Sequence, residues 1–198
     1  GPHPNSIIFL TCDAYGIMPP VARLDSHQAM YHFISGYTAK MAGTETGIVD
    51  PIAAFSPCYG GPFLTLHPLV YAKILQQKLA KHQSQVYLVN TGWVGSNASS
   101  GSKRIDLKLT KHIIDLITDG KLDFNDSVKD KFFNLEIPLN LEGLDNNFLV
   151  PERSWSNLDE YYNTGNMLTK LFNENFKKFD ILDSNILNAG PKIQSKGV

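Results

Sequence analysis

The sequence lacks the features that mark several classes of protein. It has only two cysteines, with no C-x-x-C spacing, which is typical of a reduced, cytoplasmic protein. No basic region followed by a long apolar run indicates a signal peptide, and the longest apolar runs are too short to cross a bilayer. Lysine plus arginine (18) nearly balance aspartate plus glutamate (19), so bulk charge predicts neither a nucleic-acid partner nor a membrane partner.

Motifs that carry chemistry are also missing. No G-x-x-x-x-G-K-[ST] phosphate-binding loop occurs, and the six histidines include no H-E-x-x-H motif and no i, i+4 pair. We therefore assign no catalytic residue and no metal ligand to this chain. If it belongs to a nucleotide enzyme, the phosphate cradle lies outside these residues.

The residues that are present predict a folded α/β protein. The chain has 198 residues, of which 42% are hydrophobic, enough for one ordinary core in one or two domains. Apolar runs and periodicities predict strands at 7–12, 85–90 and 132–138, helices over about 27–40, 68–82, 109–117 and 158–176, and a loose tail from 188. Because strands and helices roughly alternate, the expected class is α/β.

The middle of the chain carries the strongest local signal for a ligand. The predicted strand at 85–90 runs into the sequence NTGWVG, then a Ser/Gly loop, then Lys103 and Arg104 and a helix. Glycines let backbone N–H groups approach phosphate or ribose, and an arginine can stack on a base or pair with phosphate. The alternative is a solvated basic pair ahead of a helix.

Four other features each have two interpretations. Asp13 follows a strand, where α/β enzymes place active residues, but it is equally placed to cap the turn before Gly16. Cys58 is either a reactive thiol at a pocket or a small apolar residue. Phe63 is either core or a wall for an adenine ring. The glycine- and proline-rich stretch 42–61 is either a lid or a plain connector.

Taken together, four blocks resemble one known family. They are FLTCDAYGIMPPV at 9–21, YHFISGYTAKMAGTE at 31–45, FSPCYGGPFL at 55–64 and NTGW at 90–93. Their order is similar to that of ATP-dependent phosphoenolpyruvate carboxykinase, and the resemblance runs from about residue 3 to residue 191. The Ser/Gly insertion before Lys103 looks like that of fungal members.

The resemblance implies a mixed sheet with flanking helices, forming part of the nucleotide-binding C-terminal domain, over residues 1–198. It places Arg104 and Ile105 at the adenine and ribose, with Lys103 beside them, and Thr110 at a further nucleotide contact. Phe63 matches an aromatic wall of the adenine pocket. Residues 36 to about 55 correspond to the mobile lid that closes over substrates.

The same resemblance implies that the chain is one part of an enzyme. The parent reaction converts oxaloacetate and ATP to phosphoenolpyruvate, carbon dioxide and ADP in gluconeogenesis, with Mg²⁺ and Mn²⁺. The phosphate loop, the metal ligands and the oxaloacetate-binding arginine lie upstream, so the chain alone is expected to be inactive and to need that upstream part as its partner. A stand-alone nucleotide-binding or interaction module derived from the enzyme is the alternative. The oligomeric state stays open, with a homo-oligomer among the options.

Overall fold

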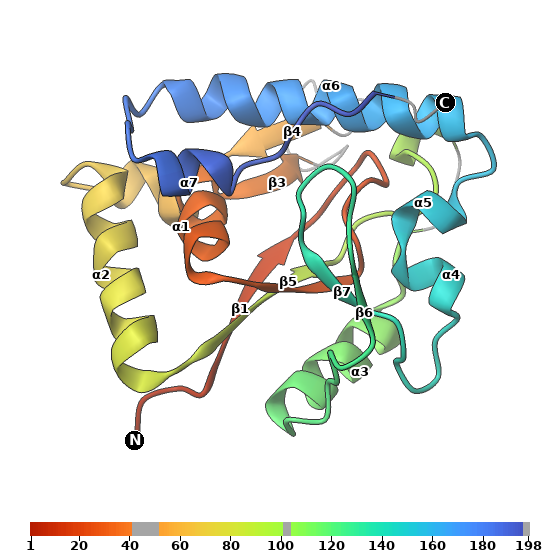
Figure 1. Ribbon diagram of the computed structural model, residues 1–198, viewed down its shortest axis with the longest axis horizontal. Helices are drawn as coiled ribbons and strands as arrows, with labels where there is room; N and C mark the ends of the chain where they lie inside the picture. The colour runs from red at the N-terminus through yellow and green to blue at the C-terminus, as the bar shows by residue number, and fades with distance from the viewer. Residues whose placement is uncertain (41–51, 101–103, 196–198) are drawn as a thin grey trace.

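A computed structural model describes residues 1–40, 52–100 and 104–195 of the chain (Figure 1). The strands are β1 (Ser6–Thr11), β2 (Val21–Leu24), β3 (Tyr37–Lys40), β4 (Ile52–Phe55), β5 (Gln85–Asn90), β6 (Ser127–Lys129) and β7 (Glu136–Pro138). The helices are α1 (Ser26–Ser35), α2 (Pro68–His82), α3 (Leu107–Thr118), α4 (Asn146–Leu149), α5 (Pro151–Ser154), α6 (Leu158–Lys177) and α7 (Ser184–Asn188). Short 3-10 turns are η1 (Pro57–Tyr59), η2 (Gly61–Phe63) and η3 (Ala98–Ser100).

Five strands form one mixed sheet in the order β1-β5-β2-β7-β6. Strands β1 and β5 are parallel, in a register that runs from Ser6 opposite Gln85 to Thr11 opposite Asn90. The pairs β5–β2, β2–β7 and β7–β6 are antiparallel, and β3 and β4 make a separate antiparallel pair. The expected α/β class, with a mixed sheet flanked by helices, is confirmed.

Helices cover both faces of the sheet and create two cores. The larger core, here called the α1/α6 core, receives buried side chains from α1, α2, α6 and α7. The smaller one, the α3 core, receives Ile113, Leu116 and Ile117 of α3. In Figure 1, α3 lies on the side of the sheet opposite α1 and α6. Alternate residues of β5 serve the two cores, because successive side chains of a strand point to opposite faces.

The helix predicted over 27–40 ends earlier than expected. Asp25 caps α1 through a capping box with Gln28, as a helix start requires. Gly36 then adopts a left-handed conformation (φ 53°), and its N–H donates to His32 O at 2.9 Å. A left-handed glycine of this kind is a common way for a helix to end. Residues 37–40 therefore form β3 instead of a last helical turn, so the longer helix was wrong.

The strand predicted over 132–138 is also shorter than expected, since only Glu136–Pro138 is extended. The buried carboxylate of Asp130 accepts from the N–H groups of Phe132 (3.0 Å), Phe133 (2.8 Å) and Leu135 (2.6 Å). These bonds curl the backbone into a turn. The two phenylalanines still enter the α1/α6 core, so the apolar pattern reports burial here but not strand geometry.

The C-terminal segment is not the loose tail that was expected. Helix α7 ends at Asn188, and Gly190 then packs so closely on Tyr31 that a Cβ would lie 2.5 Å from the Tyr31 ring. The Lys192 N–H donates to Phe132 O at 2.8 Å. Backbone bonds and ring packing therefore fix this segment against the body.

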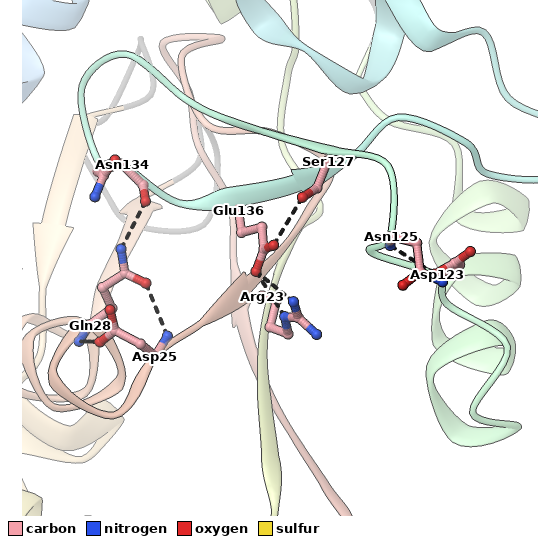
Figure 2. A network of polar contacts seen from close by, with 8 residues as sticks. All are labelled: Arg23, Asp25, Gln28, Asp123, Asn125, Ser127, Asn134 and Glu136. Atoms are coloured by element: carbon pink, nitrogen blue, oxygen red, sulfur yellow. Dashed lines mark hydrogen bonds and ion pairs between the residues drawn. The ribbon is translucent and has the colours of Figure 1, made fainter.

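Polar side chains hold the far half of the sheet in register (Figure 2). Arg23 on β2 binds the Glu136 carboxylate on β7 through Nη2 at 2.8 Å and Nε at 2.9 Å. Ser127 on β6 donates to the other oxygen of Glu136 at 2.9 Å. One carboxylate thus joins three neighbouring strands, which compensates for their short length.

Candidate functional site

The candidate site lies at the carboxyl end of β5, where the side chain of Asn90 joins two loops. Its Oδ1 accepts from the N–H groups of Asp13 (2.9 Å) and Gly92 (2.8 Å). Its Nδ2 donates to the carbonyls of Met18 and Trp93, both at 3.1 Å. Asn90 is fully buried, so these four bonds replace the hydrogen bonds that its amide would make to water. The loop after β1 and the loop after β5 are held as one unit.

Gly92 allows the two loops to approach each other. A Cβ at this position would lie 2.5 Å from the Asp13 nitrogen and 2.7 Å from its carbonyl carbon, distances that real side chains do not show. The adjacent Trp93 N–H donates to Asp13 O at 2.8 Å. A glycine is needed here for close approach of backbone to backbone.

Arg104 is bonded to this unit. Its Nε donates to Thr91 O at 2.5 Å and its Nη2 donates to Thr91 Oγ1 at 3.2 Å. Its Cζ lies 5.9 Å from the centre of the Trp93 ring, within cation–π range. The side chain remains exposed, so the guanidinium is oriented while its other N–H groups stay available to a ligand.

A pocket of about 360 Å³ opens beside Arg104, a volume suited to a small ligand. Its lining consists of Thr91, Arg104, Ile105, Leu107 and Thr110. Ile105 is 8% exposed, and its N–H donates to Gly92 O at 2.7 Å. Thr110 is buried in the first turn of α3, where its Oγ1 donates to Asp106 O at 3.3 Å. The pocket therefore combines one oriented cation, hydroxyls and an apolar floor.

The structure brings three of the five predicted binding residues together: Arg104, Ile105 and Thr110. Phe63, in η2, is 87% exposed and is not among the residues that line this pocket. Lys103 lies outside the described residues. Thr91 was not predicted as a site residue, although its place between a buried strand and Gly92 was a usable signal.

The two interpretations of Asp13 are resolved by its contacts. Its carboxylate accepts from the N–H groups of Tyr15 (3.0 Å), Ile17 (2.7 Å) and Met18 (2.8 Å). The Tyr37 hydroxyl donates to it at 2.8 Å. Burial raises the pKa of this carboxyl, and the hydrogen bonds oppose that shift. Asp13 caps its turn, and complete burial keeps it from touching a ligand.

Neither cysteine has the environment of a reactive thiol. Burial raises the pKa of Cys58 to about 11, and its Sγ lies 3.8 Å from Pro68 O. Burial also raises the pKa of Cys12, although the nearby Arg104 charge opposes the shift. Because the thiolate is the nucleophile, a raised pKa disfavours reaction at either thiol, and Cys58 fits the small apolar alternative.

A larger cavity of about 560 Å³ lies elsewhere, between α1, α6 and α7. It is lined by Tyr31, Asn173, Phe176, Lys177, Asp180, Ile181, Leu182 and Leu187. The Tyr31 hydroxyl is buried without a hydrogen-bond partner, but it has almost no surface through which a ligand could reach it. The smaller pocket is the stronger candidate, because an oriented arginine faces it.

Two kinds of feature are absent from the part of the chain that the structure describes. Within 1–40, 52–100 and 104–195, no three His, Cys, Asp or Glu side chains gather closely enough to hold a metal ion. Over the same ranges, none of the helices combines the length and the apolar character needed to cross a membrane.

Comparison with known proteins identifies the family. The family model for phosphoenolpyruvate carboxykinase matches residues 1–147. Phosphoenolpyruvate carboxykinase (ATP) of Alkaliphilus oremlandii is 50% identical over 191 residues, which cover 96% of this chain and 36% of that protein. The proteins of the same name from Candida glabrata and Emericella nidulans are 48% and 46% identical over 96% and 97% of the chain, and 36% and 32% of their own lengths. The chain thus spans about a third of the length of these relatives, and it belongs to the phosphoenolpyruvate carboxykinase (ATP) family.

Proposed function

We propose that the chain is the C-terminal part of an ATP-dependent phosphoenolpyruvate carboxykinase and supplies the adenine and ribose side of its nucleotide site. The observation that carries the proposal is the orientation of Arg104, whose guanidinium is bonded to Thr91 at the edge of the pocket. A base can stack on the free face of such a plane. Ile105 and Leu107 offer apolar surface to the base. The hydroxyls of Thr91 and Thr110 donate to Thr11 O and Asp106 O, so they meet the sugar only as acceptors.

The reaction of the whole enzyme proceeds in two steps. Decarboxylation breaks a C–C bond of oxaloacetate and leaves an enolate, and the enolate oxygen then takes the γ-phosphoryl group of ATP as ADP leaves. Both steps require neutralisation of negative charge, which bound Mg²⁺ and Mn²⁺ supply in the parent enzyme. We assign the metal ligands to the upstream part of the enzyme, as the family resemblance implies.

We further propose that β3 and β4 are the two arms of a lid. They pair from Tyr37 opposite Phe55 to Lys40 opposite Ile52, and the segment that joins them lies outside the described residues. The base of the lid is anchored, because Tyr37 and Phe55 both pack on Phe172 of α6. Closure of such a lid would exclude water from the enolate and from phosphoryl transfer.

Exposed apolar side chains favour a part of an enzyme over a stand-alone module. Phe63 is 87% exposed, Leu107 66%, Leu66 57% and Leu10 52%. Covering these side chains with an upstream part would be favourable, because apolar surface would leave water. We therefore expect the chain alone to show no turnover of oxaloacetate, and turnover without the upstream part would contradict the assignment.

The test is a calorimetric titration of the purified chain with ATP. We expect measurable binding that Arg104→Ala weakens at least tenfold, because the guanidinium contacts the nucleotide directly. Arg153→Ala is the matched control, because Arg153 is also exposed but lies on α5 and does not line this pocket. Equal affinity of the wild type and Arg104→Ala would refute the placement of the adenine.

A further inference from the structure

A further pocket, of about 230 Å³, lies where α5 and the start of α6 meet the turn that follows β6. We call it the α5 pocket. It is lined by residues of three segments: Val128, Lys129, Asp130 and Lys131, then Val150, Pro151, Glu152 and Arg153, and finally Tyr161. None of these residues lines the pocket beside Arg104. Its volume exceeds what a single water needs, so it has room for a small organic molecule.

One part of the lining is apolar. Val150 is 6% exposed and belongs to the α3 core, and Val128 packs against that core. Pro151, the first residue of α5, is buried. Because the core supports these side chains from behind, the pocket offers a preformed apolar surface to part of a ligand.

Another part of the lining is cationic. Lys129, Lys131 and Arg153 all line the pocket, and all three residues are exposed. Lys131 Nζ lies 3.8 Å from Glu152 Oε2, which is longer than a hydrogen bond. The ammonium group of Lys131 can therefore donate to another acceptor without losing a hydrogen bond to Glu152.

The two carboxylates in the lining already have hydrogen-bond donors. Asp130 accepts from the three backbone N–H groups of its own turn. Glu152 Oε1 accepts from the Tyr162 hydroxyl at 3.0 Å. Hydrogen bonds of this kind stabilise the charge of a carboxylate. Because three cations line the pocket beside two carboxylates that are already bonded, the pocket favours an anion.

Tyr161 supplies a hydrogen-bond donor. The residue is 1% exposed, and its ring packs edge-on against Phe132 with the ring centres 5.3 Å apart. Burial raises the pKa of its hydroxyl, and the charges of Asp130 and Glu152 add to that shift, so the hydroxyl stays protonated. Within the described residues, no hydrogen bond uses this hydroxyl. A buried donor that lacks a partner costs free energy, which an acceptor on a ligand would recover.

We propose that the α5 pocket binds a small organic acid. Its carboxylate accepts from the Tyr161 hydroxyl and lies near Lys131 and Arg153, while its apolar body contacts Val128 and Val150. The cations and the donor select an anion, and the apolar part of the lining favours an organic acid over inorganic phosphate. The proposal does not depend on the adenine site, because the two pockets share no lining residue.

The test is calorimetric titration of the purified chain with benzoate and with hexanoate, at constant ionic strength. We expect at least one of them to bind, and its neutral amide and inorganic phosphate to bind at least tenfold more weakly. At a free concentration ten times its dissociation constant, the bound acid should raise the Tm by roughly 3–6 °C. The proposal is overturned if neither acid binds, if the amide binds as tightly as the acid, or if phosphate binds more tightly.

Substitutions test the individual contacts. Tyr161→Phe keeps the packed ring and removes only the hydroxyl, so it should weaken binding about tenfold. Lys131→Ala removes an exposed charge and should weaken binding about two- to fivefold. Tyr71→Phe on α2 and Lys170→Ala on α6 are the matched controls, since neither residue lines the pocket. The Tm without ligand shows whether each variant folds, and full affinity in both Tyr161→Phe and Lys131→Ala would overturn the proposal.

Backbone amide chemical shifts locate the bound acid. We expect them to change at Lys129, Lys131 and Arg153, and not at Ile181, which lines the larger cavity. Changes confined to the larger cavity would overturn the proposal. The ATP titration gives a separate answer, because Arg153 does not line the pocket beside Arg104. Failure of the adenine site would therefore leave the α5 pocket in place, and the reverse also holds.

Discussion

Replacement of Asn90 by alanine should destabilise the protein strongly. The substitution removes four hydrogen bonds and leaves two backbone N–H groups and two carbonyls without their partner in a fully buried place. Each buried group left unsatisfied costs about 1–3 kcal/mol. Because water can enter the space that the amide leaves, we expect a loss of about 4 kcal/mol in the free energy of unfolding, not the full sum.

The measurement is urea unfolding followed by circular dichroism, with the thermal midpoint as a second readout. For a protein of this size, about 4 kcal/mol corresponds to a decrease in Tm of roughly 8–16 °C. Asn125→Ala is the control, because Asn125 is exposed and only its backbone N–H bonds to Asp123 (Figure 2). Its free energy of unfolding should stay within about 0.5 kcal/mol of the wild type.

A second variant separates hydrogen bonding from simple loss of volume. Asn90→Asp keeps the acceptor for the two N–H groups but places an oxygen against the carbonyls of Met18 and Trp93. We expect it to be at least as destabilising as Asn90→Ala at neutral pH, although it fills the space. A loss below about 1 kcal/mol in both variants would refute the view that Asn90 fixes the two loops.

Two further predictions concern the core. Burial raises the pKa of Asp130 to about 6 from 3.8, so the folded state binds the proton more tightly than the unfolded state. The free energy of unfolding should therefore rise by about 1.4 kcal/mol between pH 8 and pH 5, and Asp130→Asn should remove that increment; identical pH profiles of the two proteins would contradict it. In α6, Gly165 lies against Phe132, and a Cβ would come 2.7 Å from its Cε1, so Gly165→Ala should cost about 1–3 kcal/mol despite its better helix propensity. The cost is measured by thermal unfolding, with Asn163→Ala, an exposed position on the same helix, as the control. An unchanged or raised Tm of Gly165→Ala would contradict the clash.

The sequence predicts a helix or strand correctly where the residues of that element alone form a clear apolar pattern. The strand at 85–90 and the helix at 68–82 were predicted with the bounds that the structure has, because the first is a continuous apolar run and the second begins at a proline. Helix α6 was found because its buried face repeats over five turns. Strands of three or four residues, such as β2 and β6, are too short to show a period, and both were missed.

Elsewhere, tertiary contacts determine the outcome. Nothing local indicates that Asp130 turns the backbone at Phe132 and Phe133, since the same apolar letters suit a strand. The candidate site was predictable in part. Arg104 and Thr110 are close in sequence and meet at the start of α3. Phe63 is about forty residues away in the sequence, and its distance from the pocket is set by tertiary packing that a local sequence pattern does not predict.

Strand β5 ties the stability of the two halves of the molecule together. Val86 and Leu88 belong to the α1/α6 core, and Tyr87 and Val89 belong to the α3 core. Loss of β5 from the sheet would disrupt both cores, because the same six residues of backbone carry side chains of both. We therefore expect the two layers to behave as one cooperative folding unit, so that a defect introduced under α6 also weakens the α3 side of the sheet.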